Sequence, residues 1–274
     1  MKIRLPLQTR IQRFHNTLRI IMGSEQKDAN FELLRRLPRF KTVEIILFSK
    51  KFRIIDSASF LYQYGEIFKS EIYKFQVRNQ RPYIIDCGAN IGLSVIYFKR
   101  LYPNATIIAF EPDPTVFNVL TYNIHSFGFN DVILINKALW DTVTTLPFFA
   151  EGADGGRVAV QGDNKQIIRV KTERLNKYLK KPVDFLKIDI EGAETRILQN
   201  CRTQLANVRN LFVEYHSFVN TTQTLDTLLS VLKKSSFRYY ISNIGTTSSH
   251  PFIHKSSWMG MDNQLNIYAT KGKP

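Results

Sequence analysis

Apolar positions follow a repeated strand–helix pattern from about residue 81 onward. Continuous apolar runs predict strands that are buried on both faces of a parallel sheet. These runs are PYIIDCG at 82–88, ATIIAFEPD at 105–113 and DVILINKALW at 131–140. Amphipathic stretches between them predict helices at 93–103 and 114–128. The alternation predicts an α/β fold with right-handed crossovers.

The second half of this region continues the pattern less regularly. Residues 146–172 predict a strand, a glycine-rich loop and further strands, as in a hairpin excursion. A strand running into a helix (183–200), another strand and an amphipathic helix follow, the last two at 207–218 and 221–237. Two final strand candidates, 237–244 and 264–271, predict a terminal antiparallel hairpin.

The first 80 residues lack the regular strand–helix alternation and predict a separate layer. Residues 1–40 predict helices that stop near Pro38, and residues 41–56 predict two short strands around a Ser-Lys-Lys turn. Ser57 or Ser59 can cap the helix expected next. The predicted organisation is a basic helical and hairpin layer over 1–80, followed by an α/β domain over 81–274.

Charge and cysteine content narrow the cellular setting. The 274 residues carry a formal net charge of +15, and residues 1–80 hold 16 Lys and Arg against 7 Asp and Glu. Arginines interrupt every apolar run near the N-terminus, so neither a signal peptide nor a membrane span is expected. The N-terminal helix is either solvated or lies on an anionic membrane surface or substrate. With only Cys87 and Cys201, the chain is expected in a reducing compartment, the cytoplasm.

The first strand of the α/β region ends in YIIDCGANIG, in which an acid precedes two glycines and an asparagine. Glycine allows close backbone approach, and the turn lies at the switch point where open α/β sheets bind ligands. Its G-x-x-x-G spacing differs from the G-x-G-x-x-G of dinucleotide folds, and an acid there repels pyrophosphate. The expected ligand is S-adenosylmethionine, which is cationic at sulfur and has no phosphate. Its predicted contacts here are Asp86, Gly88, Ala89, Asn90 and Gly92.

The second strand ends in Glu111, one β-α-β unit after Asp86. A carboxylate at this position can accept hydrogen bonds from both ribose hydroxyls of the cofactor. The alternative is that both acids have only structural roles, with Asp86 capping the next helix and Glu111 solvated at its strand end. This explains each acid separately but not why the two occur at this spacing. Further cofactor contacts are expected from Pro112 and Asp113, and from Ala138 with its neighbours Asn136 and Lys137 near adenine.

Five motifs occur in a characteristic order: IIDCGANIGLSVIYF, AFEPDP, KALWD, DFLKIDIEGAE and FVEYHSF. Over about residues 80–217 they resemble the FkbM family of S-adenosylmethionine-dependent methyltransferases, LKIDIEGAE most distinctively. The resemblance implies methylation of hydroxyl oxygens on glycan sugars or macrocyclic natural products. It also implies a Rossmann-like class I fold, a mostly parallel sheet with helices on both faces. Residues 1–75 and the last 50 carry none of these motifs, so acceptor choice is expected there.

Candidate catalytic residues cluster at two further strand ends. Asp189 and Glu191 are two positions apart, as are Glu214 and His216, so each pair shares a strand face. In one interpretation His216 or Asp189 is a general base. In the other, Asp189, Glu214 and His216 bind a divalent metal, Mn²⁺ or Zn²⁺ rather than Mg²⁺. We favour the base without a metal. A hydrogen-bonded Glu214–His216 pair that merely closes the sheet edge is the structural alternative.

Other polar residues and loops have expected roles outside this catalytic cluster. Lys187 is expected to pair with a carboxylate, and Glu194 to be a helix-surface acid. The loop GADGGR (152–157) either reaches the acceptor or turns a hairpin, and YQYGEIF (62–68) either packs or covers the cofactor. A C-terminal loop offers the residues of a sugar-stacking site. Its candidates are His250, His254 and Trp258.

These patterns lead to one main functional hypothesis and two alternatives. The main hypothesis is an O-methyltransferase that acts on a saccharide hydroxyl of a glycan or glycolipid precursor in the cytoplasm. Residues 1–40 are the candidate contact with the inner membrane face. A nucleic-acid methyltransferase would suit the positive charge, but DIEGAE adds acids that repel phosphate. A non-catalytic S-adenosylmethionine-binding protein is the other alternative. The oligomeric state does not follow from the sequence.

Overall fold

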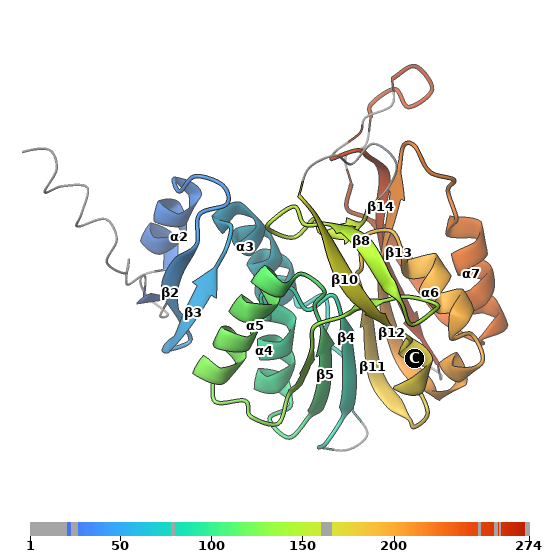
Figure 1. Ribbon diagram of the computed structural model, residues 1–274, viewed down its shortest axis with the longest axis horizontal. Coiled ribbons are helices and arrows are strands. Elements are labelled where there is room, and N and C mark those ends of the chain that lie inside the picture. Colours follow the sequence, from blue (N-terminus) through green and yellow to red (C-terminus); the bar gives the residue numbers. More distant parts are fainter. Residues whose placement is uncertain are drawn as a thin grey trace, which may run out of the picture.

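The computed structural model describes residues 21–22, 27–77, 80–159, 166–245, 248–254, 257 and 259–271. Its centre is a seven-stranded sheet in the order β13-β14-β12-β11-β4-β5-β6 (Figure 1). The strands are β4 (Tyr83–Cys87), β5 (Thr106–Phe110), β6 (Ile133–Ile135), β11 (Val183–Ile188), β12 (Val208–Phe218), β13 (Arg238–Asn243) and β14 (Met261–Thr270).

Strand direction in this sheet matches a class I methyltransferase fold. Neighbouring strands from β6 to β12 are parallel, and β14 alone runs antiparallel to both of its neighbours. The chain passes from β4 to β5 and β6 on one side, then returns to β11 on the other side of β4. The strand order therefore reverses between β4 and β11, which creates the predicted switch point. The predicted fold class and the antiparallel C-terminal pair are both confirmed.

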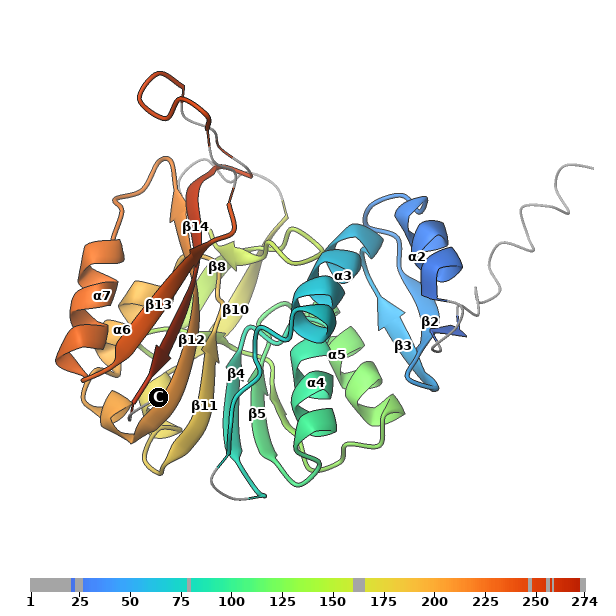
Figure 2. The same cartoon turned by 180° about the vertical axis from the view of Figure 1, so that it is seen from behind.

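Helices cover both faces of the sheet (Figures 1 and 2). On one face α4 (Leu93–Leu101) and α5 (Pro114–Ser126) share a buried core with Ile84 and Ile107. On the other face α6 (Glu194–Asn200) and α7 (Leu225–Lys234) bury the opposite side chains of the same strands. The two cores alternate along each strand because successive strand residues point to opposite faces. Short 3₁₀ turns are η3 (Leu175–Lys177) and η4 (Gln204–Asn207).

A second, smaller sheet replaces the long third strand expected at 131–140. That run divides into β6 and β7 (Ala138–Leu139), which belong to different sheets. Asn136 fixes the bend between them, because its amide donates to the carbonyls of Glu111 (2.9 Å) and Pro112 (3.0 Å). The second sheet has the order β7-β10-β8-β9. Its remaining strands are β8 (Thr145–Phe149), β9 (Arg157–Val158) and β10 (Ile167–Glu173).

The N-terminal layer packs directly on α4 and α5 (Figure 2). It contains β1 (Ile21–Met22), α2 (Lys27–Arg35), β2 (Val43–Leu47), β3 (Lys50–Ile54), α3 (Ser57–Tyr64) and the π-helical turn η2 (Gly65–Lys69). The predicted β2–β3 hairpin is confirmed, but Asp56, not Ser57 or Ser59, caps α3 by accepting from the Ser59 amide. The amide group of Asn123 joins the layer to α5 by bonding both backbone groups of Arg53.

The helices predicted over residues 1–40 and the predicted contact of this basic segment with an anionic surface are largely untested by the structure. Residues 1–20 and 23–26, which include most of the basic segment, lie outside the described residues. Among the helices of the described part, none combines the length and the apolar character that crossing a bilayer requires. Both cysteines, Cys87 and Cys201, are free and buried, as expected.

Candidate functional site

A cavity of about 520 Å³ lies at the carboxyl ends of the parallel strands. This volume is within the range of about 300–1,000 Å³ that is usual for small-molecule sites. The turns after β4, β5 and β11 form one side, and β12 and β14 contribute residues at one end. The N-terminal layer and the loop at residues 152–156 form the remaining walls.

The turn after β4 is shaped by two close backbone approaches. Gly88 has φ +94°, and a Cβ atom there would lie 1.8 Å from the carbonyl oxygen of Asp189. The amides of Gly88 and Ala89 both donate to the carbonyl of Phe110, at 3.2 and 2.8 Å. Gly88, Ala89 and Asn90, which are predicted to contact the cofactor, line the cavity. A side chain at position 88 would therefore push β4 and β11 apart at the cavity floor.

Asp86 and Gly92, predicted to contact the cofactor, are not among the residues that line the cavity. Asp86 is fully buried behind the turn, where it accepts a 2.5 Å hydrogen bond from Ser94 Oγ and lies 3.3 Å from Lys187 Nζ. Gly92 (φ +95°) begins α4, and a Cβ atom there would lie 2.8 Å from Leu120. Both residues support the turn, and direct cofactor contact by them stays a prediction.

Glu111 ties two turns together at the next strand end. One carboxylate oxygen accepts from the Asn90 amide (3.1 Å) and the other from the Asp113 amide (3.0 Å). Burial raises the pKa of Glu111 to about 8, although these backbone hydrogen bonds oppose the shift. Asp113 in turn caps α5 through the Thr115 and Val116 amides.

The cavity end near Glu111 contains most of the predicted cofactor residues. Glu111, Pro112, Asp113, Lys137 and Ala138 all line it. Asn136 does not, because its amide is used to hold the preceding turn. Phe110 and Leu139 add apolar surface, which suits a flat aromatic base.

Lys187 occupies the centre of the opposite end. Its ammonium donates to the Gly88 carbonyl (2.7 Å) and to Asp189 (3.0 Å), and it lies 3.3 Å from Asp86. Burial alone would lower the pKa of Lys187, but the charges of Asp189 and Asp86 outweigh it and hold the pKa well above its ordinary value. The expected carboxylate pairing of Lys187 is confirmed, and a fixed positive charge therefore lies beside Asp189.

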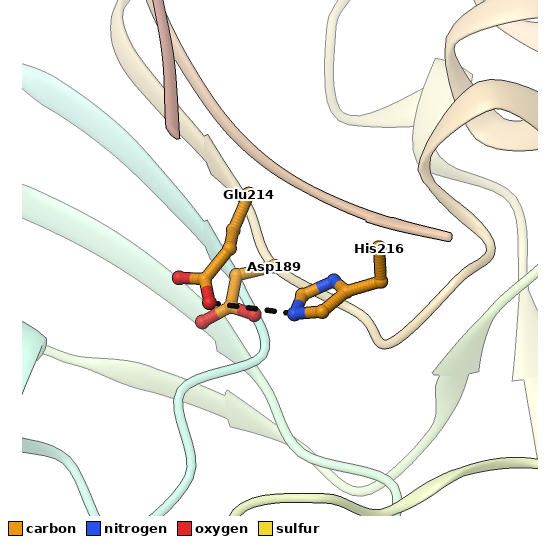
Figure 3. A group of neighbouring side chains, drawn as sticks. All are labelled: Asp189, Glu214 and His216. Atoms are coloured by element: carbon orange, nitrogen blue, oxygen red, sulfur yellow. Dashed lines mark ion pairs between the residues drawn. The ribbon is translucent and has the colours of Figure 1, made fainter. Parts of the chain in front are cut away.

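His216 lies behind the cavity wall among three carboxylates. Its Nε2 is 3.3 Å from Glu214 (Figure 3). The same nitrogen is 3.6 Å from Glu191, and Nδ1 is 3.1 Å from Glu194. Burial would lower the pKa of His216, but the charges and hydrogen bonds of these carboxylates raise it well above 6.5. His216 is therefore held as an imidazolium, which makes it a poor general base. Its ring is also absent from the residues that line the cavity.

Glu194 is buried, so the expectation of a surface acid is wrong. Its carboxylate accepts from the amides of Ile190 (3.2 Å) and Gly192 (2.9 Å) and holds His216. This bonding stabilises the sharp turn after β11, in which Glu191 has φ +55° and Gly192 φ +97°. The DIEGAE motif thus encodes a turn that directs Asp189 and Glu191 into the cavity.

The N-terminal layer and the 152–156 loop supply wall residues from the two segments whose roles the sequence left open. Tyr62, Gln63 and Glu66 line the cavity, so the 62–68 segment both packs and covers the site. Ser59 Oγ donates to Asp154 (2.8 Å), which joins α3 to the loop. Helical spacing predicts which residues of α3 are buried, but it carries no signal for the strand ends that the exposed face meets.

The proposed sugar-stacking loop is only partly described. His250 and His254 do not line the cavity, and Trp258 lies outside the described residues. Met259, from the same connection, and Met261, at the start of β14, do line it. The stacking role therefore stays a prediction.

The predicted metal ligands do come together. One ligand atom from each of Asp189, Glu214 and His216 lies within 4.8 Å of the others (Figure 3). This oxygen and nitrogen set could hold a divalent cation. In the present arrangement Lys187 already neutralises Asp189, and His216 carries the proton that a metal would have to displace.

Comparisons with known proteins agree with this geometry. The profile of the family described as "Methyltransferase FkbM domain" matches residues 86–239, more than half of the chain. Methyltransferase sdnD of Sordaria araneosa is 31% identical over 197 residues, which cover 57% of this chain and 74% of that protein. The 2-O-methyltransferase NoeI of Sinorhizobium fredii is 24% identical over 155 residues, which cover 49% of this chain and 63% of that protein.

Among solved structures, methyltransferase FkbM from Methylobacillus flagellatus superposes with a TM-score of 0.48 at 16% identity. The superposition covers 75% of this chain and 47% of that one. The matched family region runs from the end of β4 to the start of β13 and carries the glycine turn and the Asp189 turn. The predicted family is confirmed: this chain is an enzyme of the FkbM family of methyltransferases, with the fold of the S-adenosylmethionine-dependent class I enzymes.

Proposed function

We propose that this methyltransferase moves the methyl group of S-adenosylmethionine to a hydroxyl of a saccharide, in a glycan or glycolipid precursor. The observation that carries the proposal is the single cavity that joins the glycine turn and Glu111 to a carboxylate-rich end. The name of the relative NoeI, a 2-O-methyltransferase, supports transfer to oxygen. The saccharide rests on the family resemblance.

Each end of the cavity has a distinct part in this reaction. At one end Glu111 can accept from ribose hydroxyls, and Phe110, Ala138 and Leu139 can enclose adenine. Bound S-adenosylmethionine supplies an electrophilic methyl group on a sulfonium. At the other end the acceptor hydroxyl must meet that methyl in line and lose its proton. Because His216 is already protonated, a carboxylate of the cavity takes this proton.

A metal-assisted form of the same reaction is the second candidate. The grouping of Asp189, Glu214 and His216 favours it, since a divalent cation there could acidify the acceptor hydroxyl. We propose the metal-free route because Lys187 and His216 already supply the positive charge at this end. Sensitivity to EDTA, restored by Mn²⁺ or Zn²⁺, would favour the metal route instead.

The test is methyl transfer from isotope-labelled S-adenosylmethionine into fractionated lysate of source cells that lack the gene. Glycan and glycolipid, protein, RNA and small-metabolite fractions are counted separately, with and without EDTA. Label in the glycan fraction is expected. Label in RNA alone would replace the proposal with nucleic-acid methylation. Cofactor binding with no label in any fraction would favour a binding protein without catalysis.

We also propose a cytoplasmic location, at the inner membrane face where the acceptor is a glycolipid precursor. The basic residues within 1–40 support such a contact by charge alone. Cell fractionation in low and high salt tests it, because electrostatic membrane association is lost as salt rises.

A further inference from the structure

Glu66 enters the cavity from the N-terminal layer, outside the region that the family profile matches. It lies in the π-helical turn η2, directly after α3, and lines the cavity together with Tyr62 and Gln63. The carboxylates of Glu214 and Asp189 are close enough to act on it electrostatically. Glu66 therefore belongs to the carboxylate-rich end, on the wall contributed by the N-terminal layer.

The other carboxylates at this end are already engaged. Asp189 holds Lys187 at 3.0 Å. Glu214 accepts from Gln264 (2.7 Å) and lies 3.3 Å from His216, and Glu191 lies 3.6 Å from His216. Each of these three has a cationic neighbour, Lys187 for Asp189 and His216 for the two glutamates. Burial nevertheless raises the pKa of Glu191 well above its ordinary value, although the charge of His216 opposes the shift.

Glu66 differs in having no such neighbour. No Lys, Arg or His in the described part of the chain forms an ion pair with it. The groups that face it are the hydroxyl of Tyr62 on α3, Glu214 on β12, Asp189 after β11 and Tyr268 on β14. Its carboxylate thus meets two like charges and two phenols.

These surroundings give Glu66 the acid–base character that the reaction needs. Burial, together with the charges of Glu214 and Asp189, raises the pKa of Glu66 to about 7, and the Tyr62 hydroxyl partly opposes the shift. A general base works best when its pKa is near the operating pH, because it is then both deprotonated and strongly basic. At neutral pH a large fraction of Glu66 is ready to accept a proton.

We propose that Glu66 is the catalytic base that removes the proton of the acceptor hydroxyl. This inference rests on the proposed O-methyl transfer. An oxygen lone pair of the acceptor forms the new C–O bond to the methyl carbon. The C–S bond breaks with its electron pair going to sulfur, which neutralises the sulfonium. The hydroxyl proton goes to the carboxylate of Glu66 and is released to solvent after the product leaves.

The first arm of the test measures catalysis. The full-length Glu66→Gln, Glu66→Asp and Glu32→Gln proteins are compared with the wild type on the labelled acceptor fraction from pH 5.5 to 8.5. Glu32 is an exposed acid of the same layer and carries the matched charge loss. We expect kcat to fall about 10²- to 10³-fold in Glu66→Gln. The loss in Glu66→Asp should be smaller, and Glu32→Gln should be unchanged. The wild-type rate should rise through about pH 7, and this limb should vanish in Glu66→Gln.

The second arm needs no acceptor. Carbon-13 labelling of glutamate carboxyls should show one resonance that titrates near pH 7 in the wild type and is missing from Glu66→Gln. Binding of S-adenosylhomocysteine within about twofold of wild type, with an unchanged melting temperature, shows that the variant is folded.

The outcomes separate the two proposals. Glu66 titrating in the ordinary glutamate range overturns the base assignment whatever the acceptor is. The assignment is equally overturned if Glu66→Gln keeps more than a third of the activity, or keeps the limb near pH 7. If the wild type labels no glycan while Glu66 titrates near pH 7, the saccharide proposal is contradicted. The assignment of Glu66 as the base for another hydroxyl acceptor would then stand.

Discussion

The two ends of the cavity are built in different ways. The end near the glycine turn and Glu111 uses short segments that each follow a strand, and its contacts are largely backbone hydrogen bonds. The carboxylate-rich end combines Glu66 from the N-terminal layer, Asp189 after β11, and Glu214 and Gln264 from paired strands. Its contacts are between side chains that are distant in sequence.

This difference shows why one fold can keep a cofactor site while its acceptor site varies. A turn fixed by backbone bonds tolerates little change, because a side chain at Gly88 would collide with the next strand. A site assembled from side chains on several elements can change one residue at a time.

The largest effect is expected from Gly88→Ala. Its Cβ would lie 1.8 Å from the Asp189 carbonyl in a backbone conformation that L residues rarely adopt. We expect a loss of about 3 kcal/mol in unfolding free energy and no measurable cofactor binding. Thermal unfolding and calorimetry with S-adenosylhomocysteine measure both. Gly128→Ala is the control, since φ at Gly128 is also positive (+79°) but no atom lies within 4 Å of the added Cβ. Near-wild-type cofactor binding by Gly88→Ala would contradict the argument from the close approach to Asp189.

Asp189→Asn should separate the two ends of the cavity. Lys187 would keep Asp86 and the Gly88 carbonyl as partners, so the fold and cofactor binding should survive. The rate of methyl transfer should fall about 10²-fold, because the acceptor end loses a charge and the site of Lys187 is altered. Single-turnover kinetics with labelled cofactor measure the loss, and Asp226→Asn on α7 is the control. Equal losses in rate and in cofactor affinity would show that the two ends are not separable.

Glu111 should make the cofactor-free protein less stable as the pH rises. Its folded-state pKa of about 8 exceeds its ordinary value of 4.5, so the folded state holds a proton that the unfolded state releases between these values. Unfolding free energy should therefore fall across about pH 4.5 to 8, by up to about 1.4 kcal/mol per pH unit. Urea unfolding at several pH values checks this, and Glu111→Gln should flatten the slope. An unchanged slope in that variant would assign the effect to other groups.

The smallest effect is expected from Ser59→Ala, which removes the hydrogen bond between α3 and Asp154. The cost should be about 1 kcal/mol, the usual value for one such bond. Hydrogen exchange should become faster in the 151–156 loop while the glycine turn keeps its protection. Ser230→Ala on α7 serves as the comparison. Unchanged exchange in the loop would mean that other contacts hold it, such as the bond from Asn90 to the Ala153 carbonyl.

Sequence patterns predicted the alternating strands and helices of the α/β region well because these depend on local signals. The spacing of apolar residues, the helix-ending prolines and the glycine spacing predicted β4, β5, α4 and α5. The position of an acid at a strand end singled out Glu111 and Asp189. The patterns failed where a side chain's role depends on what folds against it. Glu194 has the sequence context of a helix-surface acid, yet it is buried against His216. His216 has the sequence context of a base, yet three carboxylates keep it protonated.

The sequence by itself determined the family, the class I fold and the glycine turn after β4, because each is carried by short motifs of neighbouring residues. Tertiary structure alone decided which carboxyls face the acceptor and which are neutralised. Ionisation depends on burial and on charges within a few ångströms, and these neighbours come from elements up to about 200 residues apart, such as Glu66 and Tyr268. The N-terminal layer thus contributes to the site, through Tyr62, Gln63 and Glu66, because of how it packs in the tertiary structure.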